Sequence, residues 1–178
     1  MKQKRRILIP LSFILGTLLI VGISCTTTNP PIDSITPTTG LVVTSVTSTT
    51  GGGYSPRNIV AIWIESNTGI FVKTLTVKAA ERKYDLTKWE SSSKGNTVDA
   101  STGATLTSFG TVTGFWNGTD ASGKVVADGT YKVCMELTDK SATGNYSSFS
   151  FTKGTTAATQ TPANAPSFSS ISIKWMPL

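Results

Sequence analysis

The sequence predicts an all-β domain built as a two-sheet β-sandwich, and three observations support this prediction. Hydrophobic residues make up 38% of the 178 residues and charged residues only 15%. Threonine, serine and glycine are abundant, a composition that suits short strands joined by polar turns. Several short segments alternate between apolar and polar residues, and turn-forming residues separate them. A chain of this length can bury one core without disulfide bonds.

The first part of the domain predicts one strand followed by a hairpin. Residues 41–49 are rich in β-branched side chains and predict the first strand. Residues 58–65 are apolar on both faces, which is typical of a central strand that is covered on both sides. A turn at 67–69 follows, and residues 70–77 return as the next strand. We therefore expect 58–77 to form a β-hairpin.

The middle of the domain predicts one short helix and one long loop. Residues 81–90 fit a helix in which Leu86 and Trp89 share a face. Residues 91–114 form a polar stretch that is rich in serine, glycine and threonine. Loops of this length are uncommon inside a compact domain and often carry function, which makes this stretch a candidate functional loop.

The C-terminal part predicts the remaining strands. Residues 124–126 lie between two groups of turn residues, and residues 131–137 and 146–152 alternate between apolar and polar side chains. Residues 168–175 close the domain after a loop at 154–166. Each strand hides one face, and two packed sheets hide both. About seven short strands with at most one short helix fit an immunoglobulin-like (Ig-like) β-sandwich over residues 41–178.

The N-terminus carries the pattern of an export signal with a lipidation site. Basic residues within 2–6 precede an apolar run at 7–23, which is typical of a secretory signal peptide. The small residues before Cys25 resemble the lipobox of bacterial lipoproteins, although Gly22 stands where leucine is usual. We expect a signal peptide at 1–24, a lipidated Cys25 and a flexible tether over 25–40. The alternative is an uncleaved transmembrane anchor, since the run is at the short end of the spanning range.

Both alternatives attach the domain to a membrane in the cell envelope, facing the periplasm or the cell exterior. Several lipid chains on one residue give a stable attachment. Thr26, which follows Cys25, is not the aspartate that retains lipoproteins in the inner membrane. The sequence therefore mildly favours the outer membrane.

Charge and residue types exclude several functions. The formal charge of +6 includes four basic residues of the signal, and without them twelve basic residues stand against ten acidic ones. A net charge of +2 without a basic cluster predicts no nucleic-acid partner. The chain has no histidine, which excludes Ser-His-Asp and Cys-His arrangements. We expect no catalytic residue and no metal site, because Asp120, Asp128 and Asp139 lack the spacing of calcium ligands.

Cys134 has no disulfide partner once Cys25 is lipidated. It lies within the alternating segment 131–137, where we expect a small side chain on a strand. A free reactive thiol is the alternative interpretation.

Segments 54–65, 69–75 and 98–105, with Trp89 between the second and the third, resemble the exported bacterial proteins of domain-of-unknown-function family 2271. The resemblance covers roughly residues 40–140. It implies export, and the members of this family look like companions of flavin-linked and membrane-linked redox systems.

A second resemblance concerns residues 71–75 and 116–131, which are similar to the Ig-like domain of flagellar hook-capping proteins. In this pattern, Trp116 and Tyr131 anchor the base of a turn-rich loop. The resemblance implies a structural module.

One motif points to chemistry. Asp99-Ala100-Ser101-Thr102-Gly103-Ala104-Thr105 resembles the recognition motif for covalent flavin attachment, in which an aspartate is followed after two free positions by Ser/Thr-Gly-Ala-Thr. The resemblance implies that a flavin transferase joins flavin mononucleotide (FMN) to Thr105 by a phosphoester, and that Asp99, Thr102, Gly103 and Ala104 complete the motif. The alternative is structural: Thr102 and Gly103 form a tight turn that the side chain of Asp99 caps.

Two functions follow from these observations. The first is a membrane-anchored, extracytoplasmic and non-catalytic Ig-like domain that has an interaction or structural role beside another envelope protein, without a cofactor. The alternative is an electron carrier that holds FMN on Thr105 and passes electrons to an envelope redox partner. An enzyme is not expected, because no nucleophile, base and orienting group can be named together.

Overall fold

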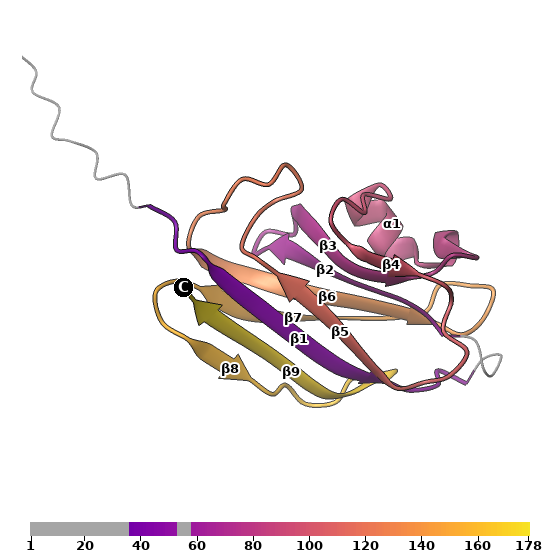
Figure 1. The fold of residues 1–178 in the computed structure, drawn as a ribbon. Coiled ribbons are helices and arrows are strands. Elements are labelled where there is room, and N and C mark those ends of the chain that lie inside the picture. Colours follow the sequence, from indigo (N-terminus) through magenta and orange to yellow (C-terminus); the bar gives the residue numbers. More distant parts are fainter. Residues whose placement is uncertain (1–35, 53–57) are drawn as a thin grey trace, which may run out of the picture. The chain divides into compact units, whose positions relative to one another are not determined.

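The computed structural model describes residues 36–52 and 58–178. The predicted signal peptide, Cys25 and most of the tether lie outside these residues. The described chain contains strands β1 (Gly40–Ser48), β2 (Ile59–Ser66), β3 (Phe71–Lys78), β4 (Ser101–Gly103), β5 (Thr111–Trp116), β6 (Gly129–Thr138), β7 (Asn145–Lys153), β8 (Ala158–Gln160) and β9 (Phe168–Pro177), the 3₁₀ helix η1 (Lys83–Asp85) and the helix α1 (Thr87–Ser93) (Figure 1).

The strands form two sheets, one with the order β5-β1-β9-β8 and the other with the order β4-β3-β2-β6-β7. Neighbouring strands are antiparallel except for β3 and β4, which run parallel. This arrangement confirms the predicted all-β sandwich and the predicted hairpin of β2 and β3. Among the described residues there are nine strands rather than about seven, because β4, β8 and most of β5 form in segments predicted as loops.

The main core lies between the two sheets. Strand β1 alternates strictly between buried and half-buried residues, and its buried residues Val42 and Val46 face the five-stranded sheet. The alternation predicted for 131–137 is confirmed in β6, and the alternation predicted for the last strand is confirmed in β9. The core residues of these two strands are Tyr131, Val133, Met135, Leu137, Phe168, Ile171, Ile173 and Trp175.

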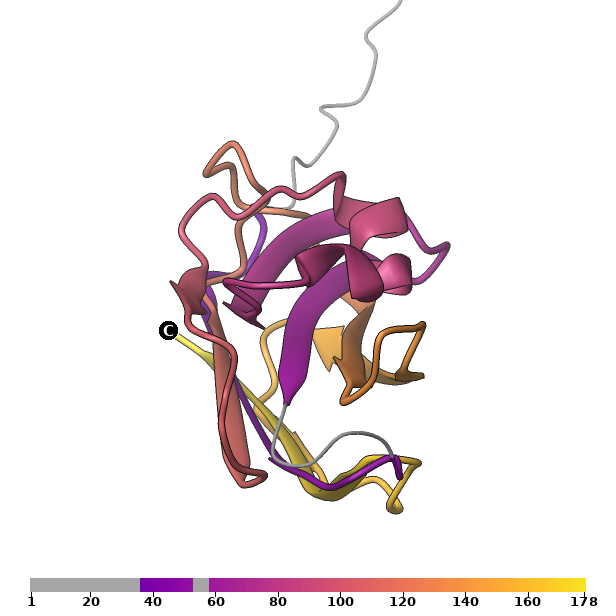
Figure 2. The same cartoon turned by 90° about the vertical axis from the view of Figure 1, so that its right-hand side faces the viewer.

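A second, smaller core lies on the outer face of the five-stranded sheet. Helices η1 and α1 pack on this face, on the side away from β1, β5 and β9 (Figures 1 and 2). Leu86 and Trp89 are fully buried there together with Trp63 and Cys134, which confirms that Leu86 and Trp89 share a face. The cover explains why β2 is apolar on both faces, as its sequence predicts.

The helix expected over 81–90 forms later and in two parts. Arg82 adopts the left-handed conformation (φ 62°), and Leu86 separates η1 from α1 with a non-helical backbone. Helix α1 begins where buried Glu136 of β6 accepts hydrogen bonds from the backbone N–H groups of Lys88 (3.1 Å) and Trp89 (2.8 Å). A carboxylate at this end satisfies N–H groups that the helix itself leaves without partners.

Two expected loops and one expected strand are wrong. Residues 91–114 are not one long loop, since they contain the end of α1, β4 and most of β5. Residues 124–126 form no strand, and only an isolated bridge joins Thr119 to Val125. Within 154–166, residues 158–160 pair with β9 as β8. Each error arises because pairing with a distant strand, rather than the local sequence, decides whether a short polar segment becomes extended.

The turn-rich loop 117–128 is anchored as the sequence predicts. The rings of Trp116 and Tyr131 lie 5.3 Å apart at its base. Trp116 Nε1 donates to the carbonyl of Thr119 (2.6 Å), and the Tyr131 hydroxyl donates to the carbonyl of Ala127 (2.7 Å). Both ends of the loop are therefore fixed to the main core.

Candidate functional site

The segment 99–105, which the sequence predicts as a flavin-attachment motif, lies along strand β3. Its middle part is β4, which pairs in parallel with residues 76–78. The connection between the two parallel strands contains η1 and α1, as parallel pairing requires a long crossover. The Thr105 hydroxyl lies 3.4 Å from the backbone carbonyl of Glu81, just beyond the end of β3. The motif is therefore a surface segment held on one strand edge.

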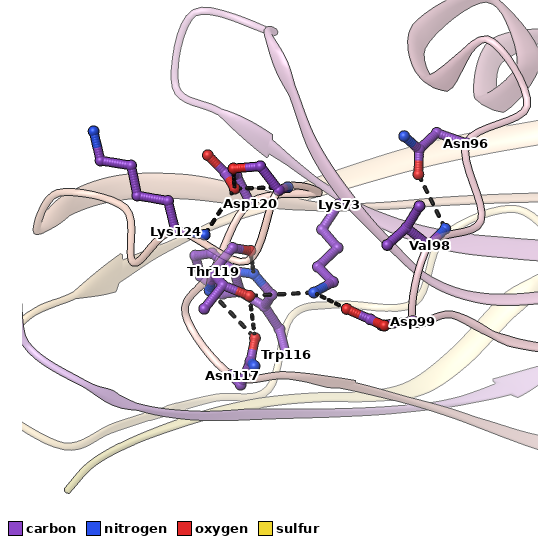
Figure 3. Close-up of polar contacts among 10 residues, drawn as sticks. Lys73, Asn96, Val98, Asp99, Trp116, Asn117, Thr119, Asp120 and Lys124 are labelled. Carbon is purple, nitrogen blue, oxygen red and sulfur yellow. Dashed lines mark hydrogen bonds and ion pairs between the residues drawn. The ribbon is translucent and has the colours of Figure 1, made fainter.

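The first motif residue, Asp99, forms an ion pair with Lys73 of β3 (Nζ to Oδ2, 3.0 Å). The Lys73 side chain is only 6% exposed, whereas that of Asp99 is 69% exposed. Lys73 Nζ also donates to the Thr119 hydroxyl oxygen (3.2 Å), and this hydroxyl donates to Asn117 Oδ1 (2.6 Å) (Figure 3). Lys73 thus joins the beginning of the motif to the loop 117–128.

The turn that leads into the motif does not depend on the side chain of Asp99. Asn96 Oδ1 accepts the N–H of Val98 (3.1 Å), and the N–H of Ala100 donates to the carbonyl of Thr97 (3.0 Å). Asp99 has a left-handed backbone (φ 56°), while its carboxylate extends to Lys73 (Figure 3). The expectation that Asp99 caps a turn at Thr102 and Gly103 is wrong, because its carboxylate pairs with Lys73 instead.

The tight turn expected at Thr102 and Gly103 is also not formed. Both residues belong to β4, and Gly103 is not among the glycines with positive φ. A Cβ atom added at Gly103 would lie 3.2 Å from Nζ of Lys78, the mobile end of a flexible side chain. The backbone conformation therefore does not require glycine at this position.

A hollow of about 500 Å³ adjoins the motif, and we call it the β4 hollow. Buried Val77, Ala79 and Trp89 form its base. Exposed Ala80, Lys83 and Thr97 surround it, and the motif residues 102–104 form its remaining wall. Its volume is typical of sites for small molecules and cofactors.

Thr105 itself is half-buried and lies at the margin of this hollow. Its neighbour Ala104 lines the hollow, and so does Ala80, which precedes Glu81, the hydrogen-bond partner of Thr105. The next residue, Leu106, is fixed by two backbone hydrogen bonds to Asn58 (3.0 and 3.1 Å). The Thr105 hydroxyl therefore lies between an exposed alanine and a firmly paired residue. The predicted motif residues lie in a row along one edge of the sheet, with Asp99 held by Lys73 at one end and Thr105 beside Glu81 at the other.

Cys134 is completely buried beneath Tyr146, whose hydroxyl lies 3.5 Å from its sulfur. Burial raises the pKa of the Cys134 thiol to about 12, so the thiolate is not populated near neutral pH. The thiol is thus a small core side chain, as the alternation predicts, and not a reactive group.

The three aspartates considered for calcium do not gather. Asp120 accepts hydrogen bonds within its own turn, Asp128 pairs with Lys153, and Asp139 accepts the N–H of Gly51. No cluster of three or more potential ligands occurs in 36–52 and 58–178. In the same residues, no helix is long and apolar enough to cross a membrane.

Sequence reasoning missed two cations, Lys73 and Lys83, and the β4 hollow. A signal for Lys73 was present, since it is the lysine in the interior of the otherwise apolar and threonine-rich strand 70–77. A buried lysine needs a partner of opposite charge or hydrogen-bonding groups. Nothing in the local sequence indicates the hollow, because residues from five separate segments form it.

The fold and the site define the class of this protein as an all-β, two-sheet sandwich domain that presents one short motif on a sheet edge beside a hollow. The chain belongs to the family DUF2271, described as predicted periplasmic proteins, whose pattern matches residues 42–168. The family description agrees with a location in the envelope. No curated protein and no solved structure matches the chain. The resemblance to hook-capping proteins stays a prediction.

Proposed function

We propose that the mature protein is a lipid-anchored, extracytoplasmic and non-catalytic carrier of FMN on Thr105. One observation carries this proposal: the motif residues 102–104 line a cofactor-sized hollow, and the fold does not need their small size. Gly103 has an ordinary strand backbone, and Ala104 is exposed. Small residues at these positions instead leave room for a modifying enzyme and for the attached group.

The attachment reaction balances with flavin adenine dinucleotide as the donor. The hydroxyl oxygen of Thr105 bonds to the flavin-side phosphorus, and the bond from this phosphorus to the bridging pyrophosphate oxygen breaks. Adenosine monophosphate leaves with the hydroxyl proton. The flavin transferase supplies the catalysis, so this chain needs no base near Thr105.

The chain's own residues would hold the motif in a fixed position for this reaction. Lys73 holds Asp99 at the beginning of the motif, β4 pairs with β3, and Asn58 fixes Leu106 directly after the acceptor. Once bound, a flavin supplies the ability to accept and donate electrons. The protein then acts as a carrier whose domain reaches its partners from a membrane tether.

The lipid anchor on Cys25 is part of this proposal. At the start of the domain, the N–H and the hydroxyl of Thr38 donate hydrogen bonds to the Asp128 carboxylate (2.9 and 2.5 Å). The preceding segment, up to the lipidated Cys25, would then be the tether. Replacing Cys25→Ala should abolish incorporation of a labelled fatty acid and release the protein from membranes without detergent. A Cys25→Ala protein that remains in the membrane would instead identify an uncleaved anchor.

The flavin is tested by expressing the full chain with and without a flavin transferase. With the transferase, the intact mass should rise by one FMN and the protein should be yellow. Thr105→Ala should remove the added mass completely, while the control Thr107→Ala, an exposed threonine two residues away, should keep it. A native chain without added mass, or a labelled Thr105→Ala protein, refutes the proposal.

A second candidate function is an interaction module without a cofactor. Strand β7, nine residues long, forms one edge of the five-stranded sheet in the described chain. Such an edge can accept an additional strand from a partner protein. In this case Ser148→Lys together with Ser150→Lys, both exposed positions of β7, would abolish binding to an envelope partner. Thr105→Ala would leave that binding unchanged.

A further inference from the structure

We infer that the β4 hollow is the binding site for the isoalloxazine ring of the flavin attached to Thr105. This inference rests on the proposed function and adds where the ring lies and which residues act on it. Three motif residues, Thr102, Gly103 and Ala104, line this hollow, whereas Asp99 lines a separate and smaller one of about 260 Å³. The site of attachment and the proposed site of the ring are therefore adjacent.

The position of the acceptor supports this placement. The Thr105 hydroxyl points to the carbonyl of Glu81, and the residue before Glu81, Ala80, also lines the hollow. A phosphoester on this oxygen begins at the margin of the hollow. The flexible ribityl chain between phosphate and ring then allows the ring to fold back over residues 102–104.

The size and the composition of the hollow also suit the ring. Its volume of about 500 Å³ lies within the range of roughly 300–1,000 Å³ that is usual for small-molecule and cofactor sites. The base consists of the side chains of Val77, Ala79 and Trp89. A flat aromatic ring on this base would be removed from water on one face while its other face stays accessible to a redox partner.

Lys83 gives the site a predictable electrochemical property. It is the exposed cation that lines the hollow, at the beginning of η1. Two-electron reduction adds negative charge to a flavin, and a nearby ammonium group stabilises that charge. Lys83 should therefore raise the midpoint potential of the bound flavin. Because Lys83 is exposed, salt should weaken this effect.

The first test fills the hollow and keeps the attachment site. Ala80→Trp places a large side chain at an exposed position of the hollow, and Ala157→Trp is the matched control at an exposed position beside β8. Both proteins are produced with the flavin transferase, and intact mass records the label. We expect full labelling of all three proteins. Visible circular dichroism of the flavin should be strong in the native chain and in Ala157→Trp, and should be lost in Ala80→Trp.

Far-ultraviolet circular dichroism checks that each variant is folded. If Ala80→Trp fails to fold, Thr97→Trp fills the same hollow from the other side of its rim. Access of iodide to the flavin, measured as fluorescence quenching, gives a second readout. Quenching should increase in the filled variants and stay unchanged in Ala157→Trp.

The second test measures the midpoint potential. Lys83→Gln should lower it at low salt, whereas Lys174→Gln, an exposed lysine on β9, should leave it unchanged. The two hypotheses fail differently. A native chain without label refutes the proposed function. A labelled chain whose flavin dichroism and quenching are the same in the native and filled proteins refutes the ring site alone.

Discussion

The substitution Gly103→Ala distinguishes the two explanations of the motif, one structural and one functional. If the fold needs glycine at position 103, adding a methyl group destabilises the protein. If the transferase and the flavin need the space, the same methyl group leaves the fold intact and impairs labelling. The structure predicts the second result, because Gly103 lies in β4 without a positive φ.

The expected change in the free energy of unfolding is small. The new Cβ would approach Nζ and Cδ of Lys78 at 3.2 and 3.3 Å, so the end of this side chain must move. The movement breaks exposed hydrogen bonds to Ser101 and Thr102, which contribute about 0.5 kcal/mol each. A Gly-to-Ala change at a compatible backbone position gains about 0.4–1 kcal/mol through the unfolded chain. The net change should therefore be within about 0.5 kcal/mol of zero.

Gly123→Ala is the matched control. Gly123 has a φ of 85°, and no atom lies within 4 Å of an added Cβ, so the change introduces backbone strain alone. This strain should cost about 1–2 kcal/mol. Urea unfolding of the purified proteins measures both values, and intact mass after timed exposure to the transferase measures labelling.

We expect opposite outcomes for the two variants. Gly103→Ala should unfold like the native protein and label at least about tenfold more slowly, since one methyl group in a close approach is commonly worth that factor. Gly123→Ala should unfold more easily and label normally. A loss of more than about 1 kcal/mol in Gly103→Ala would show that the backbone requires this glycine and would contradict a functional role for its small size.

Further predictions concern stability and reactivity. Asp128→Asn removes the negative charge beside Lys153, whose side chain is fully buried and whose Nζ lies 2.5 Å from the carboxylate, and it should cost about 2–4 kcal/mol in urea unfolding. Lys153→Met should cost less, and a smaller loss for Asp128→Asn than for Lys153→Met would contradict this explanation. Hydrogen bonds from Lys153 and Thr38 lower the pKa of Asp128 below its ordinary 3.8. The stability that the Asp128 carboxylate contributes is therefore present above that pH and is lost as the pH falls towards the lowered pKa. Acid unfolding of the native protein and of Asp128→Asn should show this difference. Glu136→Ala should cost about 1–3 kcal/mol and speed hydrogen exchange at the Trp89 amide, while unchanged exchange would exclude the capping role. Cys134 should resist alkylation at pH 8 until the protein is unfolded, and rapid native alkylation would disprove its burial.

The sequence predicts the long strands well because alternation is a local property. Residues 131–137 alternate, and Tyr131, Val133, Met135 and Leu137 are confirmed as the inward face of β6. Residues 58–65 are apolar on both faces and lie in a sheet that is covered on both sides. The short strands could not be predicted in this way. Ser101–Gly103 and Ala158–Gln160 contain no apolar alternation, and they are extended because β3 and β9 offer open edges.

The all-β class and the main strands could be predicted from the sequence alone, and the same holds for the position of the segment 99–105. These features depend on the order of residue types along the chain. Tertiary structure alone decided that the motif runs parallel to β3. It also placed Asp99 on Lys73, 26 positions away in the sequence, and formed the hollow beside Thr105. Contacts between distant segments depend on which edges and faces the folded sheets leave open, and no local pattern records that choice.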